Sequence, residues 1–190
     1  MTAIGEGASQ AVTSQINSMG TNALIIFPGA TNFGGVSSGT GGSQHLTEED
    51  ANALKASTWL SAVAPAVGTG VQIVAGNANW STRITGTTPS YFTVRNWPFV
   101  SGASFSDADA KSGTKVCILG KTVVTNLWGE GVDPVGQTVR IKHEPFTVIG
   151  VLQEKGSNSF GQDQDDIIIA PLATVQRKLA GITWINNIMA

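Results

Sequence analysis

Apolar residues near the start of the chain follow two different periods. Over 2–19 they recur at helical spacing, and Gly20 is a typical stop, so this segment predicts an amphipathic helix. The segment 22–27 (NALIIF) is short and apolar and ends at Pro28-Gly29, which predicts a buried strand. A helix leading into a strand indicates layered packing of helices against sheet.

The next two segments are polar but differ in kind. Segment 29–43 is rich in Gly, Ser and Thr and cannot bury enough apolar area to order itself, so we expect a mobile loop. Thr47 followed by three acidic residues predicts the start of a helix that runs to about Ser57, because a hydroxyl caps the first turn and the helix dipole favours acids there. The helix explains these acids without a metal or catalytic role.

The rest of the chain alternates short apolar stretches with turn residues. Strands are predicted at SAVAPAVG, VQIVAG (71–76), WSTRITGT (80–87), 116–119, 167–169 and 184–189. A hairpin with one solvent-exposed face is predicted from 138–142 and the apolar run that begins at Phe146. Helical spacing follows at 123–128, ended by Gly129, and again at 172–179, ended by Gly181. The mixture predicts an α+β fold.

Composition narrows the possible partners. The 190 residues are 41% hydrophobic with a net charge of −2, and Arg177-Lys178 is the only adjacent basic pair, so no basic stripe is available for nucleic acid. Low charge and many glycines favour a location outside the cytoplasm. No window resembles a membrane span or a signal peptide, so any export must be directed by sequence outside this chain. Cys117 fits a small buried hydrophobe, and the two histidines lie too far apart in sequence to indicate zinc.

The stretch VCILGKTVV contains Gly120-Lys121-Thr122, the tail of a phosphate-binding loop. A complete loop needs a glycine five positions before Gly120 to build its anion nest. That position is Lys115, and Gly113 comes two positions too early. A strand that enters a helix explains these residues, and we expect no bound nucleotide or other cofactor.

Asp163, Asp165 and Asp166 raise the question of calcium. A calcium loop would continue with a polar ligand and a glycine, but Ile167 and Ile168 follow. A solvated turn before a buried strand is the better interpretation, with weak cation binding left open. No nucleophile has the local context of a catalytic site, so the sequence predicts a non-catalytic chain.

Several segments together resemble a known family. In order they are MTAIGEGASQAVTSQINSMGTNALIIFPG, TGTTPSYFTVRNWPFVSGASFSDAD, KVCILGKTVVTNLWG, DPVGQTVRIKHEPFTVIGVLQEKG and FGQDQDDIIIAPLATVQRKLAG. They are similar to the periplasmic core domain of MacB-like ABC transporter permeases, over nearly the whole chain.

This resemblance implies a two-part α+β fold. A porter-like part would be formed by both chain ends, 1–70 and 155–190, the second incomplete, with a smaller α/β part, 71–154, inserted between them. It implies a periplasmic domain of an inner-membrane protein, attached through flanking membrane helices that lie outside this chain. The first helix would act as the lever that moves the domain.

The resemblance also implies a function and partners. The domain would couple cytoplasmic ATP hydrolysis, carried out elsewhere, to an adaptor protein and an outer-membrane exit duct, in a homodimeric transporter. An alternative is a related permease in lipoprotein release or a signalling complex, and a third hypothesis is an independent nucleotide-binding enzyme. For docking, the exposed loops 33–42 and 160–164 are the candidates, with Phe33, Gly34, Gly35, Phe160, Gly161, Gln162, Asp163 and Gln164.

Overall fold

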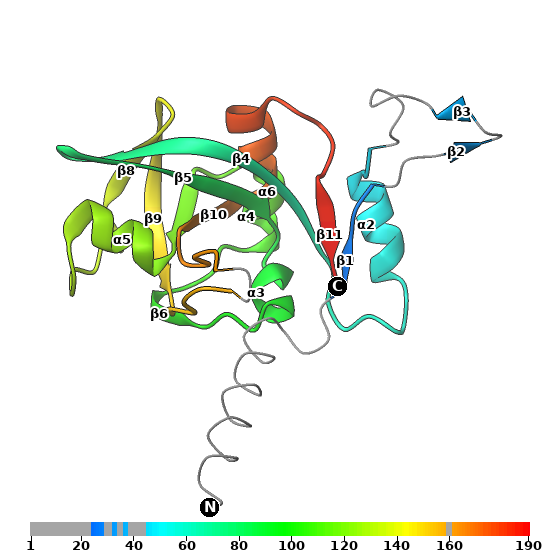
Figure 1. Ribbon diagram of the computed structural model, residues 1–190, viewed down its shortest axis with the longest axis horizontal. Helices are drawn as coiled ribbons and strands as arrows, with labels where there is room; N and C mark the ends of the chain where they lie inside the picture. The colour runs from blue at the N-terminus through cyan, green and yellow to red at the C-terminus, as the bar shows by residue number, and fades with distance from the viewer. Residues whose placement is uncertain (1–23, 29–31, 34–35, 38–44, 159–160) are drawn as a thin grey trace, which may run out of the picture.

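The two longest strands, β4 (Ala64–Ala75) and β5 (Ala78–Thr87), form a hairpin to which most other elements attach (Figure 1). The computed structural model describes residues 24–28, 32–33, 36–37, 45–158 and 161–190. The hairpin is paired from Val67↔Gly86 to Ala75↔Ala78. The stretches SAVAPAVG and VQIVAG, predicted as separate strands, belong to this one continuous strand, because Gly68 and Gly70 leave its pairing intact.

The other described elements are short and follow one another closely. In chain order they are β1 (Ile25–Ile26), β2 (Asn32–Phe33), β3 (Val36–Ser37), α2 (Glu48–Lys55), α3 (Ser90–Val94), β6 (Phe99–Gly102), α4 (Asp107–Ser112), β7 (Val116–Leu119), α5 (Lys121–Trp128), β8 (Thr138–Ile141), β9 (Glu144–Leu152), β10 (Ile167–Pro171), α6 (Leu172–Thr174), the π-helix η1 (Val175–Ala180) and β11 (Asn187–Met189).

Six strands close into a circuit around the main core. β5 pairs in parallel with β10, β10 antiparallel with β7, and β7 in parallel with β9. β8 pairs antiparallel with both β9 and β4 and so completes the ring. Mixed pairing with helices on the outside confirms the predicted α+β class.

Two hydrophobic clusters fill the fold. The larger one lies among β4, β5, β7–β10 and α5 and includes Phe146, Ile73 and Ile168, each almost fully buried. The smaller one packs α3, α4 and the following loops against β7 and β10, with Tyr91, Phe92, Trp97 and Phe105 as its aromatic members. Burial of these side chains stabilises the packed arrangement, since apolar area removed from water is the main stabilising contribution.

The described chain ends meet at one edge of the sheet. β11 pairs antiparallel with the first residues of β4 and with β1. Leu24 N donates to Ala190 O at 2.8 Å, and Ala190 N donates to Leu24 O at 2.9 Å. The predicted strand within 22–27 is present, but the prediction that it is buried is wrong: Phe27 is 65% exposed, because β1 is an edge strand.

Most helix predictions agree with the structure. Thr47 caps α2, with Thr47 N donating to Asp50 Oδ2 at 2.8 Å and Asp50 N donating to Thr47 Oγ1 at 3.3 Å. α5 ends at Gly129 as predicted, and the predicted helix 172–179 is α6 continued by η1, with left-handed Gly181 as its cap. The predicted helix 2–19 lies outside the described residues.

Three elements lie in a segment that the sequence analysis left unassigned, and two predictions need correction. α3, β6 and α4 lie in 88–115, which the apolar pattern left unassigned, although the capping box of Ser106 and Asp109 marks the start of α4. Segment 29–43, expected to be a loop, contains the paired strands β2 and β3. The last strand is shorter than predicted and starts at Asn187.

The sheet also connects the three predicted segments. β4 crosses the boundary at 70/71, and β10, from 155–190, pairs with β5 and β7 of 71–154. The division into a porter-like and an inserted part stays a prediction. Among the described helices, none is long and apolar enough to cross a membrane.

Candidate partner-docking surface

The predicted docking residues fall into two groups. The backbone of Phe33 lies in β2 opposite Val36, whereas Gly34, Gly35 and Phe160 lie outside the described residues. Gly161, Gln162, Asp163 and Gln164 are described, and they belong to the loop between β9 and β10. Whether any of them contacts a partner stays a prediction.

Backbone hydrogen bonds hold the loop between β9 and β10 in place. Asp165 is only 2% exposed, and its carboxylate accepts from Lys155 N at 2.9 and 3.0 Å and from Gly156 N at 2.6 Å. Burial raises the pKa of Asp165, and the bonds from the two amides act in the opposite direction. The interpretation of the three aspartates as a solvated turn is therefore wrong for Asp165, whose carboxylate folds the loop back on itself.

The other two aspartates are also engaged. Asp163 accepts from Thr122 Oγ1 at 2.6 Å and from Asp165 N at 2.8 Å, and Asp166 accepts from Trp80 Nε1 at 2.8 Å. Among the residues that the structure describes, no group of three or more His, Cys, Asp or Glu could hold a metal ion.

Gly120 has a structural reason to be glycine. It caps α5, its N–H donates to Ile167 O at 2.9 Å, and a Cβ here would overlap the carbonyl oxygen of Asp165. The Thr122 hydroxyl beside it is bonded to the Asp163 carboxylate. The packing against Asp165 therefore explains Gly120 without a nucleotide.

A groove of about 1380 Å³ runs between this loop, α3 and the outer face of the β4–β5 hairpin. Residues 66–72 of β4 and 81–83 and 85 of β5 line its floor, which includes the cross-strand pairs Gly68–Thr85, Gly70–Arg83 and Gln72–Ser81. The inward face of the same strands carries Val67, Val71, Ile73 and Ile84, which are buried in the main core. In Figure 1 the loop between β9 and β10 lies below the hairpin, with α3 beside it.

Two arginines give one end of the groove a positive charge. Arg95 lies over the rings of Trp97 and Tyr91, with its Cζ 5.2 and 5.9 Å from the ring centroids, and its Nη2 donates to Gln164 Oε1 at 2.9 Å. Arg83 projects from the floor, and its exposed side chain makes no hydrogen bond or ion pair with the described residues. Burial raises the pKa of the Tyr91 hydroxyl, and the charges of Arg95 and Arg83 oppose that rise.

The opposite end of the groove is apolar. Ile25 and Phe27 of the β1 segment and Met189 of β11 line it, and the first two are among the exposed large hydrophobic residues. The groove thus brings part of one predicted docking loop together with residues that the sequence analysis did not select, namely Arg83, Arg95 and the β1 edge. The glycines at alternate positions of APAVGTGVQ were the available signal, since side chains on one face of a strand recur every second residue.

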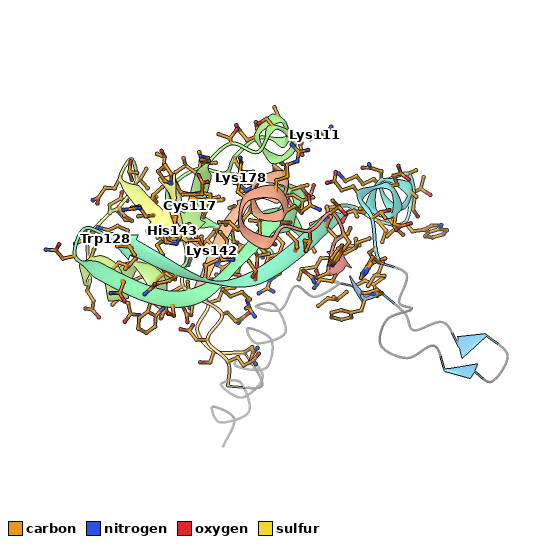
Figure 2. The ribbon with its side chains drawn as sticks, turned by 90° about the horizontal axis from the view of Figure 1, so that it is seen from above. Lys111, Cys117, Trp128, Lys142, His143 and Lys178 are labelled. Atoms are coloured by element: carbon orange, nitrogen blue, oxygen red, sulfur yellow. The ribbon has the colours of Figure 1, made fainter. Side chains whose placement is uncertain are left out.

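Reactive side chains elsewhere in the described chain do not form a catalytic group. Cys117 lies on β7 and is labelled in Figure 2. Its thiol is fully buried, and this burial raises its pKa. His45 stacks on Trp184 with ring centroids 4.4 Å apart, and His143 lies in the turn between β8 and β9. A thiol held neutral in the core is a poor nucleophile.

A family model and the sequences of known proteins place this chain in the same family. The model of the MacB-like periplasmic core domain matches residues 1–190. The macrolide export ATP-binding/permease protein MacB of Rhodospirillum rubrum is 40% identical over 191 residues, covering 100% of this chain and 29% of its own length. The protein of the same name from Syntrophobacter fumaroxidans is 39% identical over 188 residues, with 98% and 26% covered. The chain thus spans less than a third of these relatives.

Solved structures show the same architecture. The periplasmic region of MacB from Actinobacillus actinomycetemcomitans superposes with a TM-score of 0.72 at 26% identity, covering 92% of this chain and 76% of that one. The extracellular domain of the noncanonic ABC-type transporter YknZ from Gram-positive bacteria also gives 0.72, at 21% identity, with 88% and 82% covered, a likeness of fold alone. The predicted family is therefore confirmed, and with it the porter-like fold. The chain belongs to the MacB-like periplasmic core domains and is a periplasmic domain of an inner-membrane ABC transporter permease.

Proposed function

We propose that this chain is a non-catalytic coupling domain, which carries motion driven by cytoplasmic ATP hydrolysis to a periplasmic adaptor and an outer-membrane exit duct during efflux. The transporter would be a homodimer, anchored through membrane helices outside this chain. The match to the family over the full chain supports this proposal, as do the relatives' names, which combine ATP binding with a permease.

The observation that carries the proposal is the join between the chain ends and the strand circuit. Leu24 and Ala190 are bonded to each other, and β11 pairs with β4 at Ala64–Ala66, next to the residues of β4 that pair with β5. β4 is a continuous strand of 12 residues. A displacement applied at this join would therefore move the hairpin, and the groove on its outer face, as one rigid element.

Asn186 reinforces this join. Its Oδ1 accepts from Gly68 N at 2.9 Å, and its own N–H donates to Ala66 O at 2.9 Å. The side chain thus extends the contact between the β11 segment and β4 beyond the last paired residues. Docking at the predicted residues Phe33 to Gly35 and Phe160 to Gln164 stays part of the proposal.

The test is an uncoupling substitution in the full-length permease, reconstituted with adaptor and duct. Asn186→Ala removes the acceptor for Gly68 N, and we expect export to fall several-fold while basal ATP hydrolysis stays within about twofold, since a coupling element acts on the link between two sites. Asn79→Ala is the matched control, because Asn79 lies at the tip of the hairpin, away from the join.

Two results would count against the proposal. Unchanged export by a folded Asn186→Ala permease would show that this join does not carry the motion. Export that proceeds at full rate without adaptor and duct would favour the alternative function, a permease that serves lipoprotein release or a signalling complex.

A further inference from the structure

The groove contains buried polar atoms that have no hydrogen-bond partner. Four such side-chain atoms occur among the described residues, and three of them belong to residues that line this groove: Arg95 Nε, Gln164 Nε2 and Asn187 Oδ1. Buried polar atoms are nearly always bonded, and each exception needs an explanation. Their gathering in one groove indicates a ligand that supplies the missing bonds.

The chemistry of these atoms defines the ligand. Arg95 Nε and Gln164 Nε2 are donors and call for an acceptor, whereas Asn187 Oδ1 is an acceptor and calls for an N–H. The two donors are adjacent, because Arg95 Nη2 and Gln164 Oε1 are bonded to each other at 2.9 Å. A backbone segment offers both kinds of group.

The charges add a preference for an acidic residue. Arg83 of β5 and Arg95, which follows α3, both line the groove, and Arg95 Cζ lies 5.9 Å from the Tyr91 ring centroid. The acids on the groove, Asp163 and Asp166, are already held by Thr122 and Trp80. Lys142 also lines the groove, and its Nζ donates to Leu179 O at 2.7 Å. Neither Arg83 nor Arg95 is ion-paired with a carboxylate among the described residues, and carboxylates suit guanidinium groups well.

We propose that the groove binds an extended peptide segment of a partner protein, with an acidic side chain between Arg83 and Arg95 and an apolar side chain further along the segment against Ile25 and Phe27. This inference rests on the proposed docking function and deepens it by naming the chemistry of the segment. The glycine floor suits such a ligand, because a Cβ at Gly70 would meet no atom within 4 Å, so a backbone can approach the strand closely.

Binding can be tested on the full 190-residue chain by nuclear magnetic resonance, with acetyl-Leu-Asp-Leu-amide as the probe and acetyl-Leu-Asn-Leu-amide as its neutral match. We expect saturable shifts of the Nε–Hε signals of Arg83 and Arg95 and of the Gln164 amide signals. The acidic peptide should bind roughly tenfold more tightly than the neutral one, the ratio expected of a charge-assisted bond.

A pair of variants locates the site. Arg83→Gln should weaken the acidic peptide severalfold and abolish most of its preference over the neutral one. Lys111→Gln makes the same charge change on α4, on the far side of the hairpin from the loop between β9 and β10, and should leave binding unchanged (Figure 2). Equal effects of the two substitutions would overturn the proposal.

Other results would also overturn it. Equal affinity for both peptides, or shifts confined to other surfaces, would exclude a carboxylate between the arginines. Shifts that appear only after residues 1–23 are removed would show that the groove is occupied by the chain's own N-terminal segment. Concentration-dependent shifts of the same signals without peptide would indicate a second copy of the chain. None of these results bears on the uncoupling test of Asn186, so the two proposals fail separately.

Discussion

Gln164 and Asp165 are neighbours in one loop, yet their surroundings differ. Asp165 lies in the core, and both of its oxygens accept bonds from Lys155 N and Gly156 N. Gln164 lines the groove, where its Nε2 and the adjacent Arg95 Nε are buried without partners. The hydrogen bonds of Asp165 are complete, and they hold the loop in the fold. The buried donors of Gln164 and Arg95 are unpartnered, which suits them to bind a ligand that the isolated chain does not contain.

The largest expected effect tests the close packing of Gly120 against the buried Asp165. Gly120→Ala would force a Cβ into the carbonyl of Asp165, and we expect it to lower the free energy of unfolding by about 3 kcal/mol. Gly70→Ala, on the open groove floor, should change it by about 0.5 kcal/mol or less. Urea denaturation of both variants checks this, and similar losses for the two would contradict the contrast.

Removing the carboxylate of Asp165 comes next. Asp165→Ala leaves the amides of Lys155 and Gly156 without acceptors, which we expect to cost about 2 kcal/mol of unfolding free energy. Asp165→Asn retains one oxygen and should cost less. Thermal unfolding, followed by circular dichroism, gives the order, and a loss from Asp163→Ala as large as that from Asp165→Ala would show that Asp165 has no special role.

A substitution at Gln164 should have the opposite sign. Gln164→Glu removes an unused donor and places a carboxylate beside Arg95, so we expect the free energy of unfolding to rise by about 1 kcal/mol. The same carboxylate should compete with the acidic peptide and weaken its binding. If the variant is destabilised, or still prefers the acidic peptide, then Arg95 and Gln164 already have all the hydrogen-bond partners they need.

The smallest effect concerns an exposed cap and depends on pH. Hydrogen bonds from Ser106, with a further one from Thr114, lower the pKa of Asp109 below its ordinary value of 3.8. A lowered pKa in the folded state contributes stability above the unfolded pKa, and this contribution is lost as pH falls through the folded pKa. The destabilisation of Asp109→Asn relative to the parent chain should therefore shrink on acidification below about pH 4. Urea denaturation over a pH series measures it, and a constant difference would contradict it.

The sequence predicted the parts of this fold that depend on local pattern. Ile167 to Ile169 read as a buried strand, and Thr47 read as a helix cap, because each signal lies within a few adjacent residues. The exposure of β1 could not be predicted, since its burial depends on strand order in the sheet rather than on its own apolar residues.

The groove, too, could be predicted only in part, because it depends on contacts between distant parts of the chain. The loop at Gly161–Gln164 was selected for its composition, but Arg83 and Arg95 meet it only through pairing between β5 and β10 and through the position of α3. Asp165 was mistaken for a surface residue because a run of acids is usually solvated, and its amide partners lie 9 and 10 positions away. Contacts that the tertiary fold creates leave no trace in spacing.

Hydrogen–deuterium exchange on the full-length permease, with and without its adaptor, tests the central claim most directly. If the groove docks a partner, exchange in residues 161–166 and along the floor strand β5 should slow when the adaptor is present, while α4 on the far side stays unchanged. Slower exchange confined to α4 or other surfaces, with the groove unaffected, would contradict the claim that this groove is a docking site.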